Sequence, residues 1–326
     1  MIRVINALLA IVGGVGGALL VFYVLNKLVE MLPQKWEERL KPYAFILPAV
    51  AAIGVFLIYP AVRTIILSFA NSTSTAWVGM KNYTDLLSSS DFRITLVNTL
   101  LWIAVVPAVV VALGLAIATL ADRLGSQGEK LTKSSIFLPM AISGVGAATI
   151  WRFIYETRPA GETQIGLQNA IWTALGFDPV AWLQVDTLRL NTFLLMIILI
   201  WAQVGFSMVL LSAAVKGVPI DTIEAARIDG ANERQIFFRV VFPVMAPINI
   251  VIVVITVIEA LRAFDIVYIF NRGKNGLELL STLITNNGIS ESNRVGFASA
   301  IAVILLLISL GPIIAFLART MRENRR

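Results

Sequence analysis

The chain has 326 residues, of which 58% are hydrophobic and only 14% are charged, and its mean hydropathy is +0.83. This composition is too apolar for an ordinary soluble domain and predicts an integral membrane protein. The chain has no Cys and no His, which excludes disulfides, thiol or imidazole chemistry and the common zinc sites. No spaced cluster of Asp and Glu suggests a metal site, and the net charge of +6 fits cations gathered beside anionic lipids.

Apolar segments long enough to cross a bilayer recur along the chain. A hydrocarbon core of roughly 30 Å needs about 20 helical residues. The hydropathy pattern therefore predicts an all-α, polytopic helical bundle with seven spans, near residues 5–28, 43–70, 95–121, 134–156, 190–215, 244–270 and 297–318.

The first apolar segment is predicted to be a retained membrane helix within residues 1–30. It extends for more than 20 residues and has no clear small-residue cleavage site, unlike a secretory signal. Its four glycines at 13–17 allow either close approach of another helix or flexible packing without a partner. Residues 31–42 are predicted to form an interfacial linker, followed by a six-span core domain at 43–320 and a basic tail at 321–326.

The distribution of cations predicts the orientation of the chain. If the tail is cytoplasmic, the inner segments hold fourteen Lys and Arg residues, whereas the outer segments hold seven. Short loops rich in Lys and Arg stay in the cytoplasm. The bias therefore predicts that residues 216–243 and the tail are cytoplasmic, and seven spans then leave Met1 outside.

The polar insert at 216–243 lies between two long apolar segments and is predicted to be a helix, a turn and a second helix. Local signals mark its ends: Asp221 with Glu224 at a helix start, Gly230 at a helix stop, and Asn232 with Gln235 at the next start. The second helix should bury one apolar stripe, and Pro243 should open a membrane helix. The stripe consists of Ile236, Phe237, Val240 and Val241.

The insert resembles the cytoplasmic coupling loop of permease subunits from binding-protein-dependent ABC importers. The shared pattern is Glu-Ala-Ala, three residues, Gly, nine residues, an aliphatic residue, one residue, an apolar residue and Pro. Its positions here are Glu224, Ala225, Ala226, Gly230, Val240, Phe242 and Pro243. Val240 and Phe242 stand where the family usually has Ile and Leu, so the apolar character is kept. Capping alone would explain only two or three of these residues.

The resemblance implies a six-span type I importer permease core, here with an extra N-terminal membrane helix. It also implies a second homologous permease subunit, a pair of ATPase subunits and an extracytoplasmic binding protein, in a bacterial cytoplasmic membrane. The chain has no G-x-x-x-x-G-K-[ST] stretch, so ATP and Mg are expected on the ATPase and the chain itself is not expected to be an enzyme. No nucleic-acid signature is present.

The coupling role is expected to fall on particular residues of the insert. Glu224 is expected to contact an Arg of the ATPase, Ala225 and Ala226 to allow close approach, and Gly230 to set the angle between the two short helices. Asp229 and Pro243 complete the expected coupling set. The loop would then pass ATPase closure into rotation of the adjoining spans.

Further short stretches are similar to the carbohydrate-importing, maltose-type branch of this family, and their order along residues 43–320 is more informative than any one of them. The resemblance favours an α-glucoside or other disaccharide as solute. The stretches include Tyr59-Pro60, the run from Trp77 to Tyr83, Asn98-Thr99-Leu100, Phe137-Leu138-Pro139, Ile150-Trp151-Arg152 and the run from Glu259 to Tyr268.

Sugar recognition needs hydrogen-bonding groups and aromatic faces inside a cavity, so polar and aromatic residues within the spans are the candidates. They form three pairs at helical spacing of four: Asn98 with Trp102, Trp151 with Tyr155, and Gln203 with Ser207. Interhelical hydrogen bonding and an interfacial aromatic belt are the structural alternatives.

The sixth predicted span contains three charged residues, which suggest either a structural ion pair or a part of the translocation path. An unpaired charge at the centre of a membrane helix costs at least about 2.5 kcal/mol, and Arg262 lies three residues from both Glu259 and Asp265. Structural pairing and a role in the translocation path or an outer gate both remain open. An alternative function would use these charges in an ion-coupled secondary transporter or channel, and a third would be an assembly factor without a solute path.

Overall fold

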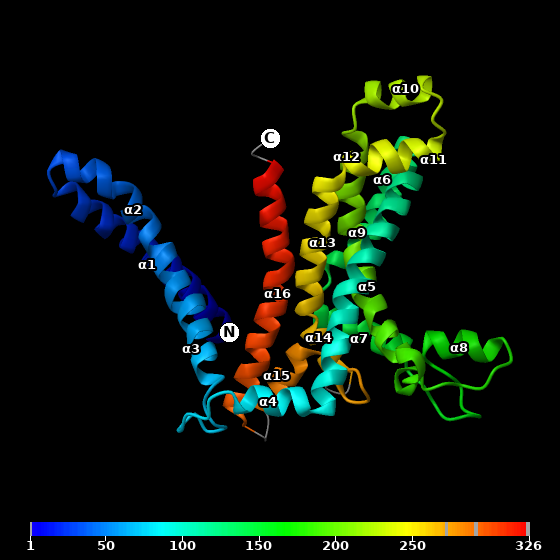
Figure 1. The fold of residues 1–326 in the computed structure, drawn as a ribbon, viewed down its shortest axis with the longest axis horizontal. Coiled ribbons are helices and arrows are strands. Elements are labelled where there is room, and N and C mark those ends of the chain that lie inside the picture. The colour runs from blue at the N-terminus through cyan, green and yellow to red at the C-terminus, as the bar shows by residue number, and fades with distance from the viewer. Residues whose placement is uncertain (1, 271–272, 290–292, 324–326) are drawn as a thin grey trace. The chain divides into compact units, whose positions relative to one another are not determined.

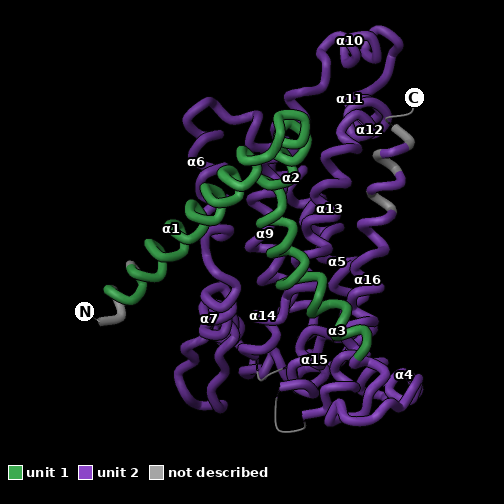
Figure 2. The backbone as a smooth tube through the Cα atoms, turned by 90° about the vertical axis from the view of Figure 1, so that its left-hand side faces the viewer, with its two compact units in different colours: residues 1–66 green, residues 67–326 purple. Residues whose placement is uncertain are grey.

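The computed structural model describes residues 2–270, 273–289 and 293–323, which divide into two compact units at residues 1–66 and 67–326 (Figure 2). Helices dominate both units. The β-structure in the described ranges is an isolated bridge between Ala70 and Trp77. The predicted all-α membrane fold is thus confirmed.

Unit one is a pair of apolar helices. Helix α1 (Ile2–Glu30) is followed by α2 (Gln34–Ile53), which runs through a π-helical turn at Gly54–Ile58 into α3 (Tyr59–Leu67). Residues 34–42, within the predicted interfacial linker, form the first part of this long helix. The second span groups with α1 in unit one. Apolar side chains of α2 point outward all around, which suits a helix surrounded by lipid or other membrane helices.

Unit two contains three long continuous spans: α5 (Ser90–Ala121), α9 (Leu190–Lys216) and α16 (Val295–Glu323). Helix α9 packs closely against α5 and against α6, at one glycine in each case. A Cβ on Gly114 would lie 2.5 Å from Ser207 Oγ, and a Cβ on Gly205 would lie 2.3 Å from the backbone oxygen of Ile136. Small residues at such positions let membrane helices approach closely, because lipid supplies no hydrophobic force between them.

The two other predicted spans are broken. Helix α6 (Ser126–Phe137) and a 3₁₀ turn (Leu138–Ala141) meet α7 (Gly144–Ile154) at 103°. The stretch Glu233–Val244 meets the stretch Ala246–Ile269 at 68°. Among the described residues, five continuous helices are long and apolar enough to cross a membrane, and up to seven spans are reached when each bent pair counts as one. The break before Gly144 lies inside the span predicted at 134–156, where Ser143 caps a new helix. The other bend lies at the start of the span predicted at 244–270, so the stretch Ala246–Ile269 matches that span.

Short helices cover the two ends of unit two. Figure 1 shows α10 (Ile220–Ile228) at one end and α4 (Lys81–Ser88), α8 (Leu167–Ala174) and α15 (Leu280–Gly288) at the other. Apolar side chains of α4, α15 and α16 form a second buried cluster, which includes Leu86, Leu280 and Ile301. The end that carries α10 is called the coupling end below, and the opposite end the outer end.

Candidate functional site

Helix α10 forms because a proline starts it and a glycine stops it. Pro219 occupies the N-cap position, whereas Asp221 lies in the first turn and makes no cap hydrogen bond, so the expected Asp221 cap is wrong. Its carboxylate still favours the positive end of the helix dipole. Gly230 has φ of +82°, and the N–H of Ala231 donates to Ala226 O at 3.0 Å. The predicted stop at Gly230 is confirmed, since the left-handed region suits glycine.

The second helix of the insert begins with the predicted capping box. Asn232 Oδ1 accepts from the Gln235 N–H at 2.9 Å, and Gln235 Oε1 accepts from the Asn232 N–H at 2.9 Å. Helix α11 (Glu233–Ile236) then continues through a π-helical turn (Phe237–Val241) into α12 (Phe242–Val244). Ile236 and Val241 are buried, as the apolar stripe predicts. Pro243 lies before the bend, so Pro247, in the first turn of α13 (Ala246–Leu261), opens the membrane helix instead.

One face of helix α10 packs against the rest of the protein, and the opposite face, here called the free face, is exposed. Ile223 and Ala226 are half-buried against the main core, whereas Glu224, Ala225 and Ile228 are exposed. The exposed fraction of Ile228 reaches 86%. Ala226 therefore packs inward, and the free face combines one carboxylate with apolar side chains. Asp229 is also exposed, and an ion pair of 3.1 Å between Arg227 and Glu233 ties α10 to α11.

A cluster of charges joins α5, α6 and α9 a few residues before α10 begins. Lys133 Nζ lies 3.0 Å from Asp122 Oδ1 and 2.6 Å from Glu129 Oε1, and Lys216 Nζ lies 2.5 Å from the same Glu129 oxygen. Lys133 also donates to Ser212 Oγ. These residues come from the ends of α5, α6 and α9, and Lys216 is three residues before Pro219. The cluster therefore ties α5, α6 and α9 together.

Asn98 is buried, and its side chain binds backbone carbonyls instead of lining an open path for the solute. Its Nδ2 donates to Gly276 O at 2.6 Å and to Glu278 O at 3.0 Å, and its Oδ1 accepts from Arg189. Asn98 thus holds the loop at 273–279 against the outer part of α5. Trp102, one turn further, is 1% exposed with its Nε1–H buried without a hydrogen-bond partner in the described structure.

Replacing Asn98 by Ala should loosen the loop at 273–279. The change leaves two backbone carbonyls and a guanidinium without their partner, at about 1–3 kcal/mol for each buried group. We expect faster proteolysis within this loop in the detergent-solubilised protein. Thr119→Ala is the control, because this threonine donates only to carbonyls of its own helix; equal protease resistance of the Asn98 variant would contradict the assigned role.

Of the remaining predicted sugar-contact residues in the spans, some pack between helices and one lines a cavity. Tyr155 donates from its hydroxyl to Leu194 O at 2.8 Å, and the Trp151 ring lies 5.4 Å from Tyr155 and 5.8 Å from Trp201 between centroids. Ser207 is buried beneath Gly114, whereas Gln203 is half-buried. The structure therefore does not bring all six candidates to one site.

The three charges of the sixth span lie at a break in the helix. Helix α13 ends at Leu261, and α14 (Phe264–Ile269) begins two residues after Arg262. Arg262 Nη1 lies 3.9 Å from Glu259 Oε1. Asp265 instead faces the start of α7, since its Oδ2 lies 3.5 Å from where a Cβ on Gly144 would be. A carboxylate there is stabilised by the amino end of α7.

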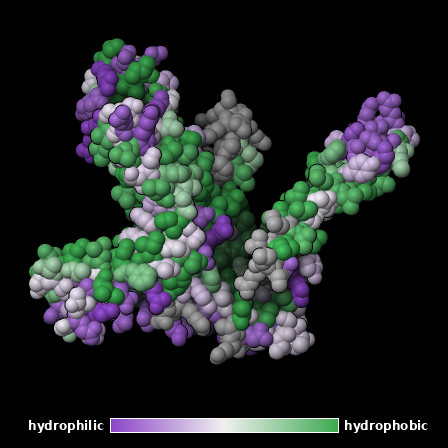
Figure 3. All heavy atoms as spheres, turned by 180° about the vertical axis from the view of Figure 1, so that it is seen from behind, coloured by the Kyte–Doolittle hydropathy of each residue, from purple (hydrophilic) through white to green (hydrophobic). Residues whose placement is uncertain are grey.

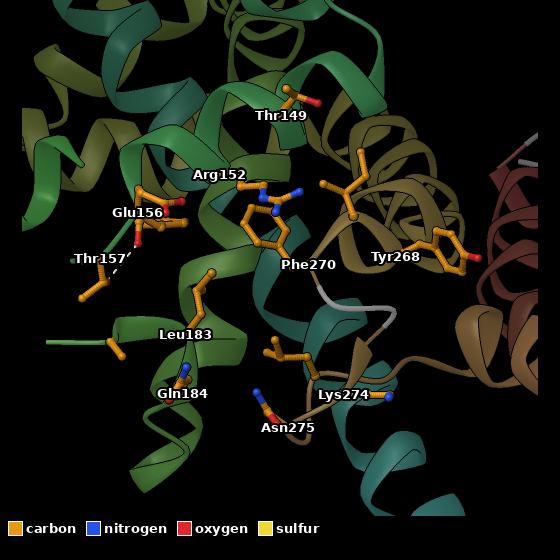
Figure 4. Close-up of a pocket in the computed structure, with 14 residues that line it drawn as sticks. Thr149, Arg152, Glu156, Thr157, Leu183, Gln184, Tyr268, Phe270, Lys274 and Asn275 are labelled. Carbon is orange, nitrogen blue, oxygen red and sulfur yellow. Dashed lines mark hydrogen bonds between the residues drawn. The ribbon is translucent and has the colours of Figure 1, made fainter. Parts of the chain in front are cut away.

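A cavity of about 970 Å³ opens at the outer end of unit two (Figure 4). Its walls come from α7, the loop at 181–184, α14 and the loop after it, and combine aromatic rings with charged and amide groups. The residues that carry this chemistry are Arg152, Tyr155, Glu156, Gln184, Tyr268, Phe270, Lys274 and Asn275. Of the predicted candidates only Tyr155 lines it. Tyr268 and Arg152 lie in stretches that carry the family resemblance, whereas nothing in the sequence marks Gln184 or Asn275.

Glu278, beside this loop, gives the outer end a pH dependence. Burial raises the pKa of its carboxyl, and Asp91 adds to the rise, while a hydrogen bond from Asn286 at 2.6 Å opposes it. Because the pKa of Glu278 is higher in the folded protein than in the unfolded chain, its neutral carboxyl stabilises the fold at low pH. This contribution to the free energy of unfolding is lost as the pH rises from the ordinary Glu pKa of about 4.3 through the pKa in the folded state.

Glu278→Gln should remove that loss, because the amide stays neutral and its oxygen can still accept from Asn286. We expect the variant to melt at a higher temperature than the parent. The difference should begin near the ordinary carboxyl pKa of about 4.3 and grow as the pH rises toward 7. Glu162→Gln, an exposed site, is the control. A constant difference at every pH would contradict the burial of a titrating Glu278.

In the described ranges, no group of three or more Asp or Glu side chains could hold a metal ion.

Comparison with known proteins identifies relatives over almost the whole chain. A model of the family "Binding-protein-dependent transport system inner membrane component" matches residues 92–323. The osmoprotective compounds uptake permease protein GgtC of Synechocystis is 45% identical over 86% of this chain and 99% of its own length. The alpha-glucoside transport system permease protein AglF of Rhizobium meliloti is 38% identical over 99% of both chains.

Solved structures agree on the fold. A chain from a bacterial ABC transporter involved in import of the acidic polysaccharide alginate superposes with a TM-score of 0.71 at 20% identity, covering 89% of this chain and 99% of that one. The family match confirms the predicted resemblance and disfavours the ion-coupled alternative. This chain belongs to the family of inner membrane components of binding-protein-dependent transport systems.

Proposed function

We propose that this chain is the permease subunit of an ABC importer that carries an α-glucoside or related disaccharide across a bacterial cytoplasmic membrane. Its partners are a second homologous permease subunit, a pair of ATPase subunits and an extracytoplasmic sugar-binding protein, with lipid around the bundle. The α-glucoside permease that aligns over 99% of both chains supports this solute class. The cation bias of the loops supports a cytoplasmic coupling end and C-terminus and an external Met1; residues 324–326 of the basic tail lie outside the described residues.

The free face of α10 is the observation that carries the coupling role. A helix that exposes Glu224, Ala225 and Ile228 at the coupling end presents a carboxylate and apolar side chains together, as a docking surface requires. ATP and Mg belong to the ATPase in this proposal. Closure of the ATPase pair would move α10, and the charge cluster at Lys133 and Lys216 would pass the movement to α5, α6 and α9.

The outer cavity is the proposed entry for the sugar. Tyr155, Tyr268 and Phe270 offer aromatic surface, and Gln184 and Asn275 offer amide donors and acceptors for hydroxyl groups. The cavity lies at the outer end, where a binding protein would deliver its ligand. Gln203, Ser207 and Trp151 would lie deeper along the path, nearer the packing of α5 against α9.

The test is uptake by the complete four-subunit complex in proteoliposomes, with the binding protein and radiolabelled maltose, trehalose, glucose or glycerol outside. We expect uptake of a disaccharide that needs internal ATP and survives ionophores that dissipate ion gradients. Uptake that persists without ATP but stops with an ionophore would support the ion-coupled alternative. Preference for glucose or glycerol would overturn the disaccharide assignment while leaving the importer intact.

A further inference from the structure

Residues 157–186, here named the outer arm, are built around one buried amide. Asn169 of α8 is fully buried, and its Nδ2 donates to Thr157 Oγ1 and to Val180 O, both at 2.9 Å. Its Oδ1 accepts from the Val180 N–H at 3.1 Å and from Trp182 Nε1 at 2.9 Å. The polar side of α8 therefore faces the inside of the arm.

The apolar side of α8 faces outward. Leu167, Ile171 and Leu175 follow one another at helical spacing of four, and their exposed fractions are 57%, 56% and 67%. Ile165 and Phe177, just outside the helix, are exposed at 55% and 52%. A helix at a water-facing surface has the reverse arrangement, with apolar residues inside. The outward face of α8 therefore needs an apolar environment.

The direction of this face identifies its environment. Figure 3 shows the outer arm with hydrophobic residues along the edge that faces the coupling end, and hydrophilic residues along the opposite edge. The apolar spans rise on the side of the hydrophobic edge, so that edge lies against the membrane. A binding protein arriving from outside would meet the hydrophilic edge. An amphipathic helix with this orientation lies in the interface plane, with its apolar face in the boundary between headgroups and acyl chains.

We propose that α8 lies in the outer leaflet of the membrane, with Leu167, Ile171 and Leu175 in contact with lipid. Trp172 strengthens the assignment, since its ring stacks on Phe177 at 4.3 Å and meets Trp182 at 5.3 Å, which forms an aromatic cluster at interfacial depth. The arm is fixed to the bundle at Gly166, where a Cβ would lie 2.1 Å from Glu156 O. Lipid contact at α8 thus holds Glu156 and Thr157, which line the outer cavity.

A nitroxide on α8 tests this contact directly, because the chain has no cysteine of its own. Ile171→Cys is labelled in the complete complex, assembled with cysteine-free partners in lipid nanodiscs, and Glu162→Cys serves as the exposed, polar control. Collision with oxygen, which concentrates in lipid, is compared with collision with a water-soluble nickel chelate. Retained ATPase activity shows that each labelled complex is intact.

We expect the label at 171 to be accessible to oxygen and protected from nickel, with the ratio reversed at 162. Accessibility to nickel at 171 equal to that at 162 would overturn the proposal in favour of water. Protection from both reagents would overturn it in favour of a protein partner covering α8. The assignment does not depend on which solute the complex carries.

Discussion

Replacing Glu224 by Lys should abolish ATP-driven uptake while leaving the permease folded. Glu224 is exposed on α10, and none of the described ion pairs or hydrogen bonds involves it, so the change costs the isolated chain little. At an interface, truncating one partner of a buried, hydrogen-bonded charge pair costs about 2–5 kcal/mol, and a reversed charge adds repulsion to that cost. We expect the variant to insert normally, to lose co-purification with the ATPase and to fall at least about tenfold in uptake, since about 1.4 kcal/mol is tenfold.

Glu38→Lys is the matched control, because it makes the same charge change at an exposed site of α2, outside the coupling end and the outer arm. Uptake and subunit assembly should be unchanged there. Normal ATPase stimulation and uptake in the Glu224 variant would remove α10 as the coupling surface. A variant that still assembles but no longer transports would keep the surface and assign Glu224 to transmission of the movement.

Replacing Gly205 by Val should destabilise the bundle more than any surface change. A Cβ at 205 would lie 2.3 Å from Ile136 O and 2.7 Å from Phe137 Cα, both backbone atoms that cannot move aside as a flexible side chain can. Overpacking of this kind costs typically about 1–3 kcal/mol and sometimes more. We expect a lower melting temperature and aggregation during size-exclusion chromatography in detergent.

Gly311→Val is the control, since a Cβ there would meet no atom within 4 Å and the same change in helix propensity, a gain from Gly to Val, applies in α16. If both variants melt alike, the approach of α9 to α6 is looser than the structure shows. A fall confined to the Gly205 variant would confirm that backbone contact, and not helix propensity, sets the effect.

The local features of the coupling loop were accessible from sequence because each depends on residues a few positions apart. The Asn232 box needs only the residue three positions on, and Gly230 needs only its own φ. The cap assigned to Asp221 failed for a local reason too: Pro219 starts α10 two residues earlier and fixes its own φ at −57°. Hydropathy likewise identified the apolar segments, but not the bend within the segment at 134–156.

The outer cavity was not accessible in this way. Its wall joins residues of α7 near 152 with residues near 184 and 270, and no periodic pattern connects them. Asn98 lies in a family-like motif within a predicted span, as a residue that contacts the solute would. Because α5 packs against the loop at 273–279, its amide instead donates hydrogen bonds to backbone carbonyls. Arg262 had two carboxylates at equal spacing, and the break after Leu261 leaves it beside Glu259.

Hydropathy, capping and the Glu-Ala-Ala spacing were enough to predict a helical membrane permease with a helix-turn-helix insert, because each of them acts within one segment at a time. The free face of α10, the position of the cavity and the direction of the apolar stripe of α8 became known from the packing of the folded chain. Those properties depend on contacts between segments far apart in the chain, and local propensity carries no information about them.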